Sequence, residues 1–90
     1  PEREDTRRPR EKKLKFTFKE QREFDTIDGE LAELEAALKE NTAAMSACGS
    51  DYVRLQELTE RQDELNAQME ERTERWMYLN ELKERIDAQS

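Results

Sequence analysis

Seven cationic side chains lie close together near the start of the chain. They are Arg7, Arg8, Arg10, Lys12, Lys13, Lys15 and Lys19, and Glu11 is the only acidic residue between positions 7 and 19. Clustered Lys and Arg side chains neutralise phosphates and release counterions, so they indicate salt-dependent binding of a polyanion. No base-reading motif accompanies them, which favours contact with a nucleic-acid backbone over recognition of base sequence. The alternative is a solvated linker that its charge keeps extended.

Residues suited to catalysis or metal binding are scarce. The chain has no His, the commonest general base and metal ligand. Cys48 therefore lacks a His that could activate it as a nucleophile. The two glycines, Gly29 and Gly49, form no phosphate-binding loop, and the many carboxylates are expected on solvated helix faces. We expect no catalytic residue, no metal site and no cofactor in this chain, and therefore not an enzyme.

The composition predicts long helices instead of a compact globule. Of the 90 residues, 43% are charged and 33% hydrophobic, with only two Gly and two Pro. Residues 1–19 carry a net charge of +4 and residues 20–90 carry −11, so a basic arm precedes an acidic body. No apolar stretch could span a membrane, and one unpaired Cys favours a cytoplasmic location. Pro1 in place of Met suggests a piece of a longer protein.

The elements that must position the cations are two helices of a hairpin. Thr17 and Glu20 fit a capping box, which starts a first helix over about 17–47. Its apolar residues recur in steps of three and four at Phe24, Ile27, Leu31, Leu34 and Leu38. A turn at 48–50 follows, with Gly49 suited to the left-handed conformation and Ser50 or Asp51 suited to capping the next helix.

The second helix, over about 51–88, repeats the same steps. Its seam reads Leu55, Leu58, Gln62, Leu65, Met69, Arg72, Trp76 and Leu79. The polar residues on this seam, Gln62 and Arg72, are expected to fix register and orientation. The predicted fold is therefore all-α: a two-helix antiparallel coiled-coil hairpin over 13–90, preceded by a disordered basic linker over 1–12.

The second helix is predicted to project beyond the first, so its far end needs an apolar cover. The remaining candidates are Leu14, Phe16 and Phe18, which we expect to pack back over Trp76 and Leu79 as a structural anchor. Arg22, Arg72 and Arg75 would then join the cationic cluster as further nucleic-acid ligands. Phe16, Phe18 and Trp76 could instead stack on exposed bases, although packing is the favoured interpretation.

Two segments resemble a known family. Residues 13–24 (KLKFTFKEQREF) resemble the "KLSYKEQRELE" start of the C-terminal domain of bacterial ABC-F ATPases of the Uup type. Residues 74–80 (ERWMYLN) resemble the "ERWEYLE" motif that ends its hairpin. The sequence departs from the family pattern at Phe16, at Asp28-Gly29 and at Met77.

The resemblance implies a parent protein with two ATP-binding cassettes and no membrane domain, which hydrolyses ATP with Mg. It further implies that the C-terminal domain binds DNA and aids the ATPase function of the parent. The expected partners are DNA or ribosomal RNA and the parent's own cassettes. The alternative function is a structural or protein-interaction module that docks on the cassettes or the ribosome. Self-association through Met77 and Leu82 is a variant of it, so the chain is expected to be a monomer or weakly self-associating.

Overall fold

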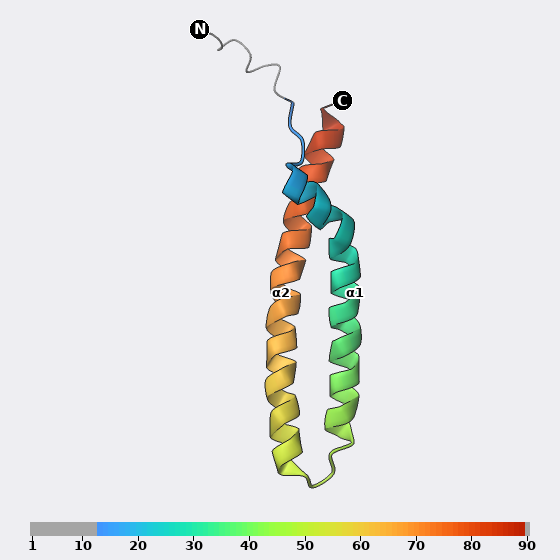
Figure 1. Cartoon of the computed structure of the whole chain (residues 1–90), viewed down its shortest axis with the longest axis vertical. Coiled ribbons are helices and arrows are strands. Elements are labelled where there is room, and N and C mark those ends of the chain that lie inside the picture. Colours follow the sequence, from blue (N-terminus) through green and yellow to red (C-terminus); the bar gives the residue numbers. More distant parts are fainter. Residues whose placement is uncertain (1–12, 90) are drawn as a thin grey trace.

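The chain folds into two long helices that run antiparallel and are joined by a short turn. The computed structural model describes residues 13–89. α1 spans Phe18–Ser46 and α2 spans Tyr52–Ala88, and the described residues include no strand. Figure 1 shows the helices side by side, with the turn at one pole and the start of α1 beside the end of α2 at the other. The predicted all-α hairpin is confirmed, whereas the linker expected over 1–12 lies outside the described residues.

The two poles have different structures, and we name them by their residues. The tip is the turn of residues 47–51 together with Tyr52 and Val53. The base comprises the leading segment, residues 13–17, with residues 18–30 of α1 and 72–89 of α2.

No helix in the described part of the chain is both long and apolar enough to cross a membrane.

A capping box begins α1, as the sequence predicts. The Thr17 hydroxyl accepts a hydrogen bond from the Glu20 backbone N–H at 3.1 Å, and the Thr17 N–H donates to Glu20 Oε1 at 3.0 Å. The two bonds satisfy donors that the first helical turn would otherwise leave free. Thr17 therefore stands outside the helix as its cap, and Phe18 is the first helical residue.

At the tip, the C-cap of α1 and the N-cap of α2 lie on either side of a glycine. α1 ends at Ser46 with Ala47 as its C-cap, and Gly49 adopts a φ of 61°, in the left-handed region that favours glycine. Asp51 caps α2, where its carboxylate accepts from the Arg54 N–H at 3.0 Å. Of the two capping candidates in the sequence, the structure uses Asp51.

The core is a narrow seam between the helices. Its buried apolar residues are Ile27, Leu58, Leu65 and Leu79, none of them more than 7% exposed. All four lie on the two predicted seams, whereas Leu31, Leu34 and Leu38 are only half-buried. Two helices cover each other on one stripe only, so this fold buries few side chains completely.

One polar residue is buried in this seam near the tip. Asn41 is 7% exposed, and its side-chain N–H₂ donates to the Leu58 carbonyl and to Gln62 Oε1, both at 2.8 Å. The amide of Gln62 in turn donates to the Thr42 hydroxyl at 3.2 Å. Gln62 thus has the cross-helix role that its position in the seam predicts.

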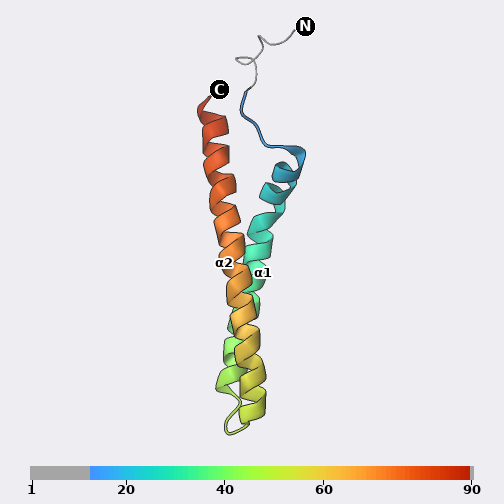
Figure 2. The same ribbon diagram turned by 90° about the vertical axis from the view of Figure 1, so that its left-hand side faces the viewer.

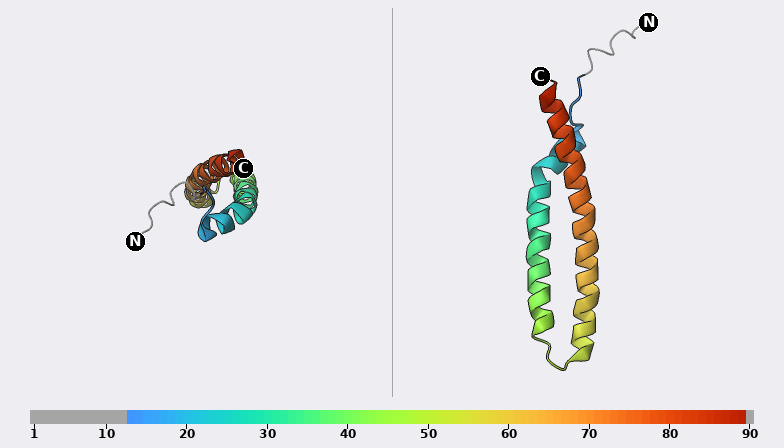
Figure 3. Two further views of the ribbon diagram at one scale, coloured as in Figure 1. Left: turned by 90° about the horizontal axis from the view of Figure 1, so that it is seen from above. Right: turned by 180° about the vertical axis from the view of Figure 1, so that it is seen from behind.

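At the base the two helices diverge. Figure 2 shows the first turns of α1 inclined away from α2, whereas in the view from behind in Figure 3 these turns cross the line of α2. In these turns the Thr26 hydroxyl donates to the Arg22 carbonyl at 3.1 Å, a bond that competes with the helical ladder and favours bending. α2, with 37 residues against 29 in α1, extends beyond its partner, as predicted.

Candidate nucleic-acid interface

The leading segment folds back onto the end of α2, as the sequence analysis expects. The Leu14 N–H donates to Gln89 Oε1 at 3.0 Å, and the Gln89 amide donates back to the Leu14 carbonyl. The ring of Phe16 lies against Phe24, with centroids 5.1 Å apart, and shares a pocket with Ile86 of α2. The segment is therefore held by α1 and α2 together, and its lysines are kept at the base.

Phe18 does not join this packing, and the expectation that it helps to cover Trp76 is wrong. Its side chain is 79% exposed. Counting back from Phe24 in steps of three and four reaches positions 20 or 21 and then 17, so Phe18 lies off the seam. Arg22, one turn further along α1, lies over its ring with Cζ 5.8 Å from the centroid.

Trp76 makes a polar contact with α1 and is not fully covered by aromatic residues. Its indole N–H donates to Asp28 Oδ1 at 2.9 Å, and the residue is still 37% exposed. An indole has an apolar body and one donor, so a half-buried site with a carboxylate partner satisfies both parts. Of the five predicted anchor residues, Leu79 is fully buried and Phe16 is half-buried, whereas Trp76, Leu14 and Phe18 are 37%, 40% and 79% exposed.

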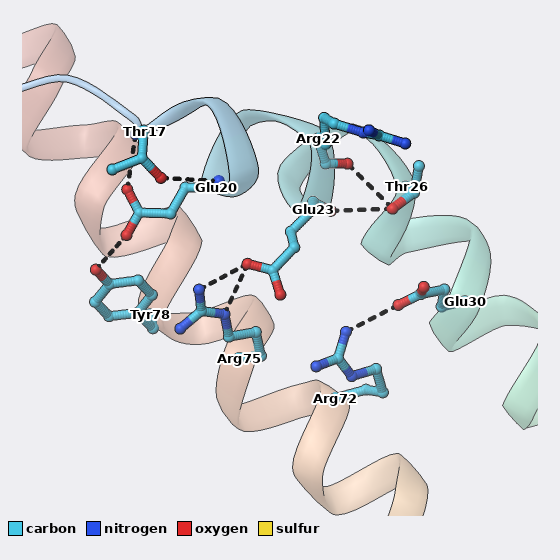
Figure 4. A network of polar contacts seen from close by, with 9 residues as sticks. All are labelled: Thr17, Glu20, Arg22, Glu23, Thr26, Glu30, Arg72, Arg75 and Tyr78. Atoms are coloured by element: carbon cyan, nitrogen blue, oxygen red, sulfur yellow. Dashed lines mark hydrogen bonds and ion pairs between the residues drawn. The ribbon is translucent and has the colours of Figure 1, made fainter.

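Arg72 and Arg75, predicted as phosphate ligands, are both engaged by carboxylates of α1. Arg75 donates through Nη2 and Nε to Glu23 Oε1 at 2.6 and 3.2 Å, and Arg72 Nη1 lies 3.0 Å from Glu30 Oε1. Figure 4 shows both pairs bridging the two helices. The bond from Arg75 lowers the pKa of Glu23 and raises the pKa of Arg75. Both arginines therefore hold the base together, which the sequence analysis did not anticipate.

Tyr78 extends the same network to the capping box. Its hydroxyl donates to Glu20 Oε2 at 2.6 Å, and its ring lies 4.7 Å from Arg75 Cζ. The pKa of Glu20 is lowered, first because the Thr17 backbone N–H donates to it and next because Tyr78 does. The pKa of Tyr78 is raised, because its hydroxyl proton is held by that carboxylate. Glu20 thus links the start of α1 to α2 (Figure 4).

The remaining cations of the predicted site that the structure describes have no such partner among residues 13–89. Lys13, Lys15, Lys19 and Arg22 are exposed, and within residues 13–89 none of them makes an ion pair. All four lie at the base. Arg85, in the last turn of α2, adds a cation that the sequence analysis missed, although the predicted hairpin already brings the end of α2 to this pole. Arg7, Arg8, Arg10 and Lys12 lie outside the described residues.

The described residues offer little else that resembles a reactive centre. Between positions 13 and 89 no three His, Cys, Asp or Glu side chains are grouped so that they could hold a metal ion. The thiol of Cys48, half-buried at the tip, donates to the Ala44 carbonyl at 3.4 Å.

These features define a class: a helical-hairpin domain whose leading segment and two helix ends meet at one pole. A family model described as the ABC transporter C-terminal domain matches residues 15–81, and the chain belongs to that family. It is 31% identical over 80 residues to the uncharacterized ABC transporter ATP-binding protein YfmR of Bacillus subtilis (strain 168). This match covers 89% of the chain but only 13% of that relative. No solved structure matches the chain.

The family assignment agrees with the geometry. The match begins at Lys15, within the leading segment, and ends at Glu81, just beyond Trp76 and Leu79. It therefore covers most of the leading segment, all of α1 and α2 as far as Glu81, with the ion pairs of Arg72 and Arg75. The chain is a C-terminal domain of the kind found in ABC transporter ATP-binding proteins. Among residues 13–89 there is only the hairpin and its leading segment, with no ATP-binding cassette.

Proposed function

We propose that the chain is a nucleic-acid-binding accessory domain of an ABC-F ATPase of the Uup type. The observation that carries the proposal is the group of four exposed cations at the base, Lys13, Lys15, Lys19 and Arg22, without carboxylate partners among residues 13–89. Residues 31–71, the rest of the rod, carry three Lys/Arg and ten Asp/Glu, so a polyanion is repelled more strongly there than at the base. DNA is the proposed ligand, and ribosomal RNA presents the same phosphates.

The residues proposed to contact phosphates differ in one respect from those predicted from the sequence. Arg72 and Arg75 are withdrawn, because releasing them from Glu30 and Glu23 would leave those carboxylates unpaired at the base. Their proposed role is to keep the first turns of α1 on α2. The upstream cations Arg7, Arg8, Arg10 and Lys12 remain in the proposal, since they precede the docked segment directly in sequence.

The Uup-type assignment rests on the two end motifs, and several properties of the parent protein come with it. The parent is proposed to be a bacterial, cytoplasmic protein that binds ATP and Mg in two cassettes outside this chain and hydrolyses the ATP. The relative in Bacillus subtilis is described as an ATP-binding protein, which supports this proposal. The hairpin itself is proposed to be non-catalytic and to act by binding.

A salt titration of the 90-residue chain with fluorescent duplex DNA tests the proposal. The logarithm of the affinity should fall linearly with the logarithm of the salt concentration, with a slope of about −0.9 per neutralised phosphate. Replacing Lys13, Lys15 and Lys19 by Gln should weaken binding and make the slope shallower. A matched control replaces Lys39, Arg54 and Arg61 by Gln, which removes the same charge from the other part of the rod.

The control separates a local site from a general effect of net charge. If both triple variants lose affinity equally, the base is not the binding site. If the unchanged chain does not bind duplex or branched DNA even at low salt, the proposed function is wrong. Circular dichroism of each variant establishes that the helices are intact before binding is compared.

A second candidate function, docking on the parent's own cassettes, is favoured by the tip. Tyr52 and Val53 are 74% and 72% exposed there, on neighbouring positions of α2. Tyr52→Ser with Val53→Ser should leave DNA binding unchanged and, under this second function, should deprotect the tip to hydrogen exchange in the full-length parent. Unchanged exchange at the tip would exclude docking through these two residues.

A further inference from the structure

Phe18 has the most exposed large hydrophobic side chain among residues 13–89. It is 79% exposed although it belongs to the first turn of α1, beside a leading segment that packs Phe16 against Phe24. Single exposed apolar residues are common on proteins and need no function of their own. The surroundings of this ring are what distinguish it.

Two cations share the outer surface of α1 with this ring. Phe18, Lys19, Arg22, Glu23 and Thr26 line a hollow of about 300 Å³. Arg22 lies over one side of the ring, and the high exposure of Phe18 leaves the ring accessible elsewhere. The one carboxylate in the lining, Glu23, is neutralised by Arg75 from α2. The hollow therefore combines an aromatic surface with two positive charges, neither of which makes an ion pair within residues 13–89.

We propose that Phe18 is a stacking platform for an unpaired nucleobase, with Lys19 and Arg22 on the phosphates that flank it. The proposal rests on the proposed function and deepens it by naming the form of the ligand. An internal base of a duplex has both faces covered by its neighbours, so within a duplex no base offers a face to the ring, whereas an unpaired base does. The preferred ligand is therefore a single strand, or a junction with unpaired bases.

Tyr52 supplies the internal comparison. It is 74% exposed, nearly as much as Phe18, and it is also the first residue of its helix. Its preceding neighbour, however, is Asp51, and it lies at the tip, away from the unpaired cations. Exposure of an aromatic ring alone would make the two positions equivalent, whereas the proposal assigns base stacking to Phe18 only.

The test compares single-stranded and duplex ligands for four versions of the 90-residue chain. Short oligothymidylate and oligouridylate and a covalently closed circular duplex, which has no terminal base pair, are titrated into the unchanged chain, Phe18→Leu, Phe18→Trp and Tyr52→Leu. Phe18→Leu should weaken single-strand binding roughly five-fold or more, because stacking one base on an aromatic side chain is worth at least that. It should change duplex binding little, whereas Phe18→Trp and Tyr52→Leu should retain single-strand affinity.

A spectroscopic measurement adds a readout that a change in stability would not mimic. With ¹³C-labelled phenylalanine, the ring signals of Phe18 should shift when oligothymidylate is added. The signals of Phe16 and Phe24, which contact each other, should stay in place. The Phe18 signals are assigned by their loss in Phe18→Leu.

The outcomes separate this inference from the proposed function. If Phe18→Leu weakens duplex and single-strand binding equally, or weakens neither, the inference is overturned while phosphate binding at the base stands. If the unchanged chain binds no nucleic acid at low salt, the proposed function falls and takes the inference with it. If Phe18→Leu loses affinity for oligothymidylate but not for oligouridylate, a DNA strand is supported as the ligand. If it loses affinity for both oligomers, either nucleic acid is supported.

Discussion

The side chain of Asn41 donates a hydrogen bond to the side-chain oxygen of Gln62 over 2.8 Å, across the seam between α1 and α2. The same N–H₂ group reaches the Leu58 carbonyl, so one buried amide touches two successive turns of the partner helix. Apolar seam residues tolerate sliding of one helix along the other, but a hydrogen-bonded pair is satisfied in one register only. The Asn41–Gln62 pair therefore specifies how the two helices align.

Removing one member of this pair should destabilise the hairpin. Asn41→Ala leaves Gln62 without its cross-helix donor and opens a gap in the seam, so the free energy of unfolding should fall by about 1–3 kcal/mol. The double variant Asn41→Leu/Gln62→Leu should recover this loss, because both polar groups are then replaced by apolar ones. Urea unfolding followed by circular dichroism measures both effects, and an unchanged midpoint for Asn41→Ala would contradict the assigned role.

Sedimentation of the same double variant tests whether the polar pair also limits association. Without a polar pair in the seam, other alignments and intermolecular pairings become competitive. We expect the Leu double variant to self-associate at concentrations at which the unchanged chain does not. Identical sedimentation of the two proteins would show that the pair does not control assembly.

The ion pairs of the base predict how stability depends on pH. The folded-state pKa values of Glu23 and Glu20 are lowered by Arg75 and by Thr17 respectively. A carboxyl with a lowered folded-state pKa stabilises the fold above its unfolded-state pKa, and this contribution disappears as pH falls through the folded-state value. The urea midpoint should therefore hold from neutral pH to about pH 5 and decrease below about pH 4.

The variant Glu23→Gln measures how much the Arg75–Glu23 ion pair contributes to this pH dependence of stability. At neutral pH the variant should have a lower midpoint than the unchanged chain, and its midpoint should decrease less on acidification. Glu35→Gln is the matched control, because Glu35 is an exposed glutamate of the same helix with no ion pair among residues 13–89. Equal pH profiles for Glu23→Gln and the unchanged chain would mean that Arg75 does not stabilise the base.

Docking of the leading segment can be measured through its aromatic pair. A double-mutant cycle on Phe16→Ala and Phe24→Ala should give a coupling energy of about 0.5–1.5 kcal/mol, the usual range for an aromatic pair at this distance. Phe18→Ala serves as the comparison and should change the free energy of unfolding by less than about 0.5 kcal/mol, because its ring is mostly in water. A larger effect for Phe18 than for Phe16 would reverse the assignment of the two rings.

The two glycines should respond to alanine in opposite directions. A Cβ on Gly29 meets no heavy atom within 4 Å, and its φ is not positive, so Gly29→Ala should raise the free energy of unfolding by about 0.5–1 kcal/mol. Gly49 has an equally open environment but a φ of +61°, so Gly49→Ala should lower it by about 1 kcal/mol. Thermal unfolding of both variants is the measurement. If both substitutions changed the free energy of unfolding in the same direction, the different roles given to the two glycines would be contradicted.

Features encoded by neighbouring residues were predictable from the sequence. The Thr17–Glu20 capping box, the left-handed Gly49 and the positions of Leu58, Leu65 and Leu79 on a seam follow from short patterns with a local physical cause. The cross-helix pairs at the base were not predictable in this way. They depend on how the first turns of α1 lie relative to α2 in space, where Glu23 meets Arg75 and Asp28 meets Trp76.

The error at Phe18 has a different origin, because a local pattern was sufficient to avoid it. Burial of aromatic rings is favourable, which favours every apolar residue near an uncovered helix end as a candidate for its cover. The steps of three and four leading back from Phe24 already exclude position 18 from the seam. Applying that pattern to the start of α1 would have separated Phe16, which packs, from Phe18, which is exposed.

The hydrogen bonds between Leu14 and Gln89 bring the two ends of the described chain together at one pole. A group attached at either end is therefore attached at the base, and the turn at Gly49 is the pole farthest from that attachment. The 37 residues of α2 give the hairpin a length of about 55 Å at 1.5 Å per residue. A rotation of the hairpin by about 5° about its base would move Tyr52 and Val53 by about 5 Å. Small changes in the angle at which the base is held would thus become displacements of atomic-contact size at the far end.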